Sequence, residues 1–165
     1  MRAVLAGLAL CFLTVPAFAQ QAAAPAASPA AGRTMVSAAD VTALIAKAKV
    51  DRKDGQALLA QSMIQLAPYN VSLEYRAAVA NAAVHDKEAE LFYVVDGSAT
   101  LVTGGKLKGE TRTNPENSSG SGIEGGVTRH VAKGDFIMVP EGTPHWFSAI
   151  DGTIVLMSLH LPRTK

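Results

Sequence analysis

Two segments decide the fold of this chain: HDKEAELFYVVDG at residues 85–97 and GDFIMVPEGTPH at residues 134–145. Each joins a run of strand-forming apolar residues to a turn. The first segment also carries His85 and Glu90 at its start, and the second ends on His145. Two imidazoles and one carboxylate suit a divalent metal that keeps open coordination positions. These three residues are therefore the candidate metal ligands.

The spacing of His85 and Glu90 fits such a site only if the chain turns between them. On one straight strand the two side chains would face opposite sides, because side chains alternate along a strand. Residues 86–88 are polar and poor strand formers. We therefore expect His85 to end one strand and Glu90 to begin the next. Donor atoms bound to one metal at about 2.0–2.2 Å should lie roughly 3–4 Å apart.

Two phenylalanines are expected to shape the pocket around the metal. Phe92 follows Glu90 by two positions, and Phe147 follows His145 by two, so each pair shares one face of its strand. Residues 140–144 are rich in proline and turn formers. That turn should fix the direction in which His145 projects.

Short apolar runs separated by turn residues predict an all-β domain of sandwich or barrel type. The expected strands include residues 71–76, 91–95, 99–103, 136–139, 146–150 and 154–161. Asp96-Gly97 and Asp151-Gly152 are each expected to be a turn, the first as the corner of a hairpin. Residues 105–126 are rich in Gly, Ser, Asn and Thr. We expect them to be a long loop and the least ordered part of the domain, because they lack an apolar repeat to pack.

The two opening segments resemble the two motifs of the cupin superfamily, over roughly residues 71–161. The residues that match the motifs in register are His85, Glu90 and Gly97 in the first and Gly134, Pro140, Gly142 and His145 in the second. The resemblance implies a cupin jelly-roll β-barrel, a homodimer and a metal inside the barrel.

The chain departs from the family pattern at two positions. The first histidine of the first motif falls on Ala83, and the asparagine that often follows the second motif falls on Ala149. Three possibilities stay open. The centre can hold Fe, Mn or Zn with three protein ligands, a residue such as His160 or Glu88 can replace the missing histidine, or the pocket can work without metal.

Three further residues have simple structural interpretations. His160 is expected to be a histidine at a strand end with a satisfied hydrogen bond, and His130 to be exposed in a polar run. Arg76 could face inward and hold an anionic substrate, or point outward into solvent.

The N-terminal part predicts export. Residues 1–19 combine an early arginine, a short apolar run and a small-x-small site ending at Ala19, as in a signal peptide. The only cysteine, Cys11, would be removed with it. Residues 20–34 read as a disordered Ala/Pro tether. We expect a periplasmic or secreted protein without membrane insertion after cleavage.

A short helical segment is expected at residues 35–68, ahead of a β-barrel at residues 69–162. Ser37 is a candidate N-cap, with Asp40 completing a capping box. Residues 56–66 are ambiguous, because their apolar pattern suits a helix or an irregular pair of strands.

The net charge limits the classes of partner that this protein is expected to bind. The formal net charge of +1 gives no basis for binding nucleic acid. A small-molecule ligand is expected, and two functions remain: a metalloenzyme acting on a small oxygen-bearing substrate, or a module that binds a small molecule or sugar without turnover. A fold alone does not choose between them.

Overall fold

The computed structural model describes residues 33–163, which form one helix and eleven strands. In chain order these are α1 (Ala38–Asp51), β1 (Leu58–Leu66), β2 (Tyr69–Arg76), β3 (Ala82–His85), β4 (Glu88–Thr103), β5 (Lys106–Lys108), β6 (Thr111–Asn114), β7 (Asn117–Gly120), β8 (Gly122–Glu124), β9 (Val127–Ala132), β10 (Phe136–Val139) and β11 (His145–Pro162). The expected signal peptide and most of the tether lie outside the described residues. No helix within residues 33–163 has the length and apolar character needed to cross a membrane.

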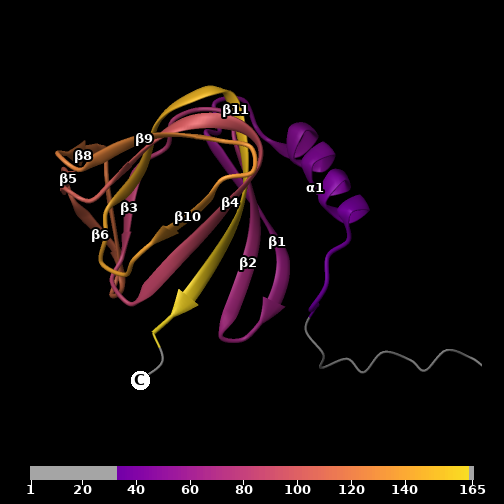
Figure 1. Cartoon of the computed structure of the whole chain (residues 1–165), viewed down its shortest axis with the longest axis horizontal. Coiled ribbons are helices and arrows are strands. Elements are labelled where there is room, and N and C mark those ends of the chain that lie inside the picture. Colours follow the sequence, from indigo (N-terminus) through magenta and orange to yellow (C-terminus); the bar gives the residue numbers. More distant parts are fainter. Residues whose placement is uncertain (1–32, 164–165) are drawn as a thin grey trace, which may run out of the picture.

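One nine-stranded antiparallel sheet bends into a β-sandwich of jelly-roll type (Figure 1). Its strand order is β1-β2-β11-β3-β7-β6, and β4 pairs with β9, β10 and β11. The sheet is not closed into a complete barrel. Strands β5 and β8 form a separate two-stranded sheet. The all-β fold class with one short N-terminal helix is therefore confirmed.

Strands β4 and β11 are the two longest strands of the sandwich. Their course shows that the hairpin expected at Asp96-Gly97 and the turn expected at Asp151-Gly152 are wrong. Each strand continues through its Asp-Gly pair without reversing direction, and the two strands pair with each other from His145↔Thr103 to Pro162↔Glu88. The register shifts between Ile150 and Ile154, opposite Gly97. A Cβ on Gly97 would lie 2.0 Å from the Thr153 carbonyl oxygen. The glycine therefore permits a bend and a close approach in the ribbon rather than a chain reversal.

Alternation along the strands separates two hydrophobic clusters. On β2, Leu73 and Tyr75 pack in an outer cluster with Ala48 of the helix, whereas the side chains of the intervening positions point the other way. The inner cluster lies between the sheet layers and includes Phe92 and Phe147. The interior is thus built from alternate residues of the long strands.

The N-terminal region is helical only in its first part. Ser37 caps α1, and the capping box with Asp40 is formed, as the sequence predicts. The helix ends at Asp51, and β1 is one strand that pairs with β2. The expectation of a helical segment as far as residue 68 is corrected, because residues 58–66 add to the edge of the sheet as a strand hydrogen-bonded to β2. In Figure 1, α1 lies beside β1, at the side of the domain away from β5 and β8.

The expected long loop at residues 105–126 is wrong, because this region contains β5 to β8. Backbone pairing supplies the order that an apolar repeat does not: β7 pairs with β3 and β6. Ile123 also joins Ala82 and Val102 in a third cluster, against Trp146. Close contacts need glycine here, since a Cβ on Gly120 would lie 2.6 Å from a backbone oxygen.

Candidate metal centre

Three strand ends meet at the candidate centre. His85 is the last residue of β3, Glu90 lies near the start of β4, and His145 is the first residue of β11. The distance from Glu90 Oε2 is 3.3 Å to His85 Nε2 and 3.1 Å to His145 Nε2. Both distances lie in the range expected for ligands of one metal. The structure therefore brings together the three residues singled out in the sequence, as a possible metal-binding group.

The turn after β10 holds the two histidine segments together. The Gly142 amide donates a hydrogen bond to the His85 carbonyl oxygen at 2.7 Å, and the Gly104 amide donates to the Pro144 carbonyl oxygen at 2.8 Å. Gly142 has a φ of 67°, a left-handed conformation that favours glycine. The proline-rich turn thus positions His145 as expected.

The Nδ1 atoms of both histidines face oxygen acceptors. His85 Nδ1 lies 2.7 Å from the Asn117 side-chain oxygen, and His145 Nδ1 lies 3.3 Å from the Thr143 carbonyl oxygen. Because a carbonyl oxygen can only accept, Nδ1 carries the proton in each ring. In the neutral form, Nε2 then presents a lone pair to the centre.

Glu90 is buried with one oxygen unsatisfied. Its Oε1 accepts a hydrogen bond from the Ser158 hydroxyl at 2.5 Å. Within the described residues, Oε2 is buried and has no hydrogen-bond partner. Its neighbours are the two Nε2 atoms, so neutral rings would place lone pairs against a carboxylate. A cation between them removes this conflict, and the donor set fits a divalent metal.

Protonation of a histidine can supply the same positive charge beside Glu90. Burial alone would raise the pKa of Glu90, but His145, His85 and Ser158 outweigh burial and hold that pKa well below its ordinary value of 4.5. Burial would lower the pKa of His85, but contacts with Glu90 and Asn117 outweigh it and raise that pKa above 6.5. The centre therefore attracts a proton or a metal ion.

The two phenylalanines lie behind the centre in the interior. Phe92 is 0% and Phe147 2% exposed. The Phe92 ring centroid lies 5.9 Å from that of His145 and 5.5 Å from that of Phe147. They form an apolar floor on one side of the histidine. Their role in lining a ligand pocket stays a prediction.

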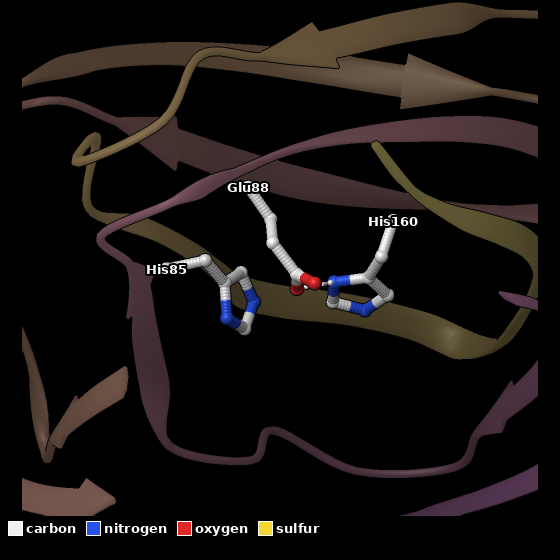
Figure 2. A group of neighbouring side chains, drawn as sticks. All are labelled: His85, Glu88 and His160. Carbon is white, nitrogen blue, oxygen red and sulfur yellow. Dashed lines mark hydrogen bonds and ion pairs between the residues drawn. The ribbon is translucent and has the colours of Figure 1, made fainter. Parts of the chain in front are cut away.

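His160 also lies beside the centre, although the sequence favoured a simple strand-end histidine. Its Nδ1 lies 3.0 Å from Glu88 Oε2, so the expected hydrogen-bond partner exists. Its ring also lies 4.9 Å from that of His85, and its Nε2 lies 3.5 Å from Glu90 Oε1. Figure 2 shows His160 and Glu88 in contact, facing His85. His85, Glu88 and His160 form a second possible metal-binding group.

Two other expectations are resolved by the structure. His130 is exposed on β9, as predicted. Arg76 points inward rather than into solvent, where its guanidinium lies 4.7 Å from the Phe147 ring centroid. Its Nη2 also lies 2.7 Å from Glu74 Oε2. This internal partner leaves no unpaired positive charge to hold an anionic substrate.

Sequence reasoning did not connect Asn117 with the candidate centre. It lies opposite His85 in the pairing of β3 with β7, inside the region expected to be a loop. No local pattern marks such a residue, because its role depends on pairing between strands far apart in the sequence.

Comparison with known families identifies the family of this chain. The family described as Cupin matches residues 50–161, which is more than half of the chain. This chain belongs to the cupin family. The resemblance found in the two motifs is thereby confirmed. A search of curated proteins gave no match to this cupin.

Solved structures share the fold at low sequence identity. A Bacillus halodurans protein, BH2720, is 15% identical with a TM-score of 0.52, over 81% of this cupin and 84% of that chain. The Fe(II) form of HppE is 14% identical with a TM-score of 0.51, over 67% of this cupin and 54% of that chain. A cupin superfamily protein from Desulfitobacterium hafniense is 14% identical with a TM-score of 0.49, over 70% and 87%. At these identities the likeness describes the fold alone.

The register of β3 locates the family's missing histidine. Ala83 pairs directly with His145 across β3 and β11, so the two side chains share one face. A histidine at position 83 would therefore lie beside His145. In this cupin that place is taken by a methyl group.

Proposed function

We propose that this cupin binds a divalent metal, Fe, Mn or Zn, between His85, Glu90 and His145. The observation that carries the proposal is the buried Glu90 Oε2, which lacks a hydrogen-bond donor within the described residues and faces two imidazole nitrogens at 3.1 and 3.3 Å. A buried charge without a partner is costly. HppE, described with Fe(II), is an example of this fold accommodating such a metal.

The residues around the centre would serve a small oxygen-bearing ligand. Glu90 and the two imidazoles hold the metal, while Asn117 and the Thr143 carbonyl fix the rings. The phenyl ring of Phe92 excludes water from one side. A bound metal would act as a Lewis acid that polarises the oxygen of the ligand. A metalloenzyme for a small oxygen-bearing substrate is the function that this arrangement supports best.

Metal content tests the proposal directly. Purified protein should contain a divalent metal, and the metal-free protein should regain it in competition with a chelator. His145→Ala should weaken binding, because one histidine and one carboxylate of the set remain. His130→Ala is the matched control, since His130 is exposed on β9. Wild-type protein that neither contains nor regains metal would overturn the proposal.

A non-catalytic binding module is the second candidate, and the replacement of a family ligand by Ala83 favours it. Dioxygen consumption and substrate turnover with a panel of small organic acids separate the two. Turnover that depends on the bound metal supports the enzyme. Saturable binding without turnover supports the module.

We further propose that the protein is exported and works as a homodimer in the periplasm or outside the cell. Support comes from the signal-like residues 1–19 and, for the dimer, from the resemblance to cupins. Mass spectrometry of the exported form should find an N-terminus at residue 20 or 21, and an intact Met1 would contradict export. Light scattering that shows a monomer would contradict the dimer.

A further inference from the structure

Ala83 stands where the family has a histidine, so a fourth protein ligand of the metal centre would have to come from another residue of this chain. Among residues 33–163, His160 of β11 and Glu88 at the start of β4 lie beside the candidate ligands. His160 pairs with Glu90 across these two strands, and directly paired residues share a face. The last strand therefore presents an imidazole to the side of the sheet that carries Glu90.

The direction of the His160 ring distinguishes it from an ordinary strand-end histidine. Its Nε2 lies 3.5 Å from Glu90 Oε1, the second oxygen of the carboxylate that His85 and His145 approach. A hydrogen bond to Glu88 accounts for Nδ1 only. It does not account for an Nε2 that lies beside the buried carboxylate.

Glu88 sets the tautomer that a ligand needs. Its Oε2 lies 3.0 Å from His160 Nδ1, and an ionised carboxylate can only accept. The proton is thereby held on Nδ1, which leaves a lone pair on Nε2 of the neutral ring. Asn117 and Thr143 play the same role for the other two histidines. All three rings thus present Nε2 toward one carboxylate.

A separate metal held by His85, Glu88 and His160 fits less well, although these donors also lie close together. His85 Nε2 already faces Glu90 at 3.3 Å, and its Nδ1 is engaged by Asn117. One nitrogen lone pair binds one metal, so the two groups cannot be filled together. Figure 2 shows Glu88 turned to the His160 ring. Glu88 therefore serves as the positioning residue.

We propose that His160 is the fourth protein ligand of the centre, oriented by Glu88, and that it replaces the histidine absent at position 83. This inference rests on the proposed metal-binding function. The ligand set would hold three histidines and one glutamate, with one imidazole supplied by the last strand instead of by β3.

The decisive experiment moves the ligand to the family position. Metal affinity is measured with Zn(II) by chelator competition, and bound imidazole nitrogens are counted with Cu(II) by electron paramagnetic resonance. His160→Ala should lower affinity by more than the roughly 100-fold that loss of an orienting partner can cost, and the count should fall from three to two. Ala83→His combined with His160→Ala should restore both. His130→Ala is the control.

The positioning role of Glu88 has its own readout. Glu88→Ala should weaken binding by about 10- to 100-fold with three nitrogens retained. Glu88→Gln should restore most of the affinity, because its amide oxygen can accept the Nδ1–H bond. Equal losses in both variants would overturn this role.

The outcomes separate the two proposals. Wild-type protein without metal affinity overturns the metal-binding function and the His160 assignment together. Wild-type protein that binds metal, with affinity and nitrogen count unchanged in His160→Ala, overturns only the assignment. Thermal unfolding of the metal-free variants checks that each is folded, which is expected because the His160 side chain is 28% exposed.

Discussion

Two glutamates, Glu74 and Glu90, lie buried in the same domain, and their carboxylates have very different partners. Glu74 on β2 is paired: Oε2 lies 2.9 Å from Arg76 Nε and 2.7 Å from Arg76 Nη2. Glu90 on β4 has a hydroxyl on one oxygen and no donor on the other within the described residues. The chain neutralises the first carboxylate by itself. It leaves the second to be neutralised by protons or by a metal.

The largest loss of stability is expected from breaking the ion pair between Glu74 and Arg76. Glu74→Ala would leave the buried Arg76 guanidinium uncompensated, and should lower the free energy of unfolding by about 3–5 kcal/mol. Urea denaturation of the metal-free protein measures the loss. Glu74→Leu with Arg76→Met should recover much of it, since replacing both charges removes the desolvation penalty. A loss below about 1 kcal/mol, as for an exposed pair, would contradict burial of this pair.

Glu90→Gln should have a small effect on stability and a large effect on metal affinity. The metal-free protein should lose less stability than in Glu74→Ala, because no fixed positive charge is left behind. Zn(II) affinity should fall by more than about 100-fold, beyond the cost of losing an orienting partner. Chelator competition and urea denaturation of the same samples measure the two effects. Equal destabilisation by Glu74→Ala and Glu90→Gln would show that the two glutamates do not differ in this way and that Glu90 has a structural role.

Much of the centre could be predicted from sequence because its determinants are local. A histidine, a turn and a carboxylate follow one another at residues 85–90, and the rigid turn before His145 fixes its direction. Convergence of the two segments then needs only the antiparallel pairing of β4 with β10 and β11. The family resemblance implied only a β-barrel with a metal inside it, and the structure supplies the pairing.

The remaining parts depend on contacts between distant segments. Asp96-Gly97 looks like a hairpin corner, and only its partner Ile154 on β11 makes it a bend. Residues 105–126 lack an apolar repeat, yet β7 is ordered by pairing with β3. His160 is a lone histidine in sequence, and its place at the centre follows from a register shared with Glu90. None of these partners can be identified from local pattern.

Ser158 offers a smaller test of the Glu90 side of the comparison. Ser158→Ala removes the only hydroxyl on Glu90 Oε1 among the described residues, and a hydrogen bond to a charged group contributes about 1.5–3 kcal/mol. The metal-free protein should lose that amount in urea denaturation. Ser72 pairs with Ser158 across β2 and β11, so Ser72→Ala removes the same group from the neighbouring strand. Equal losses in the two variants would show that the Glu90 contact contributes nothing.

The smallest effect, and the most diagnostic, is the response to pH. In the metal-free protein the raised pKa of His85 means that its stabilising contribution is complete below 6.5 and is lost as pH rises through the folded-state value. The lowered pKa of Glu90 gives a contribution that is present above 4.5 and lost as pH falls toward the folded-state value. Metal-free protein should therefore be most stable between these two limits, near pH 5–6. Its stability should decline toward pH 8 by no more than about 1.4 kcal/mol for each unit by which the His85 pKa is raised.

Metal should reverse the upper part of this profile. Metal and proton compete for the same nitrogens, so the stabilisation gained from Zn(II) grows as pH rises from 6 to 8. Thermal unfolding across this range, with and without Zn(II), measures the two slopes. Opposite signs would show that one carboxylate is served by either cation, and Glu74→Leu with Arg76→Met should leave both slopes unchanged because that pair lies outside the exchange. Parallel slopes would mean that the metal binds elsewhere and that Glu90, like Glu74, is neutralised by the chain itself.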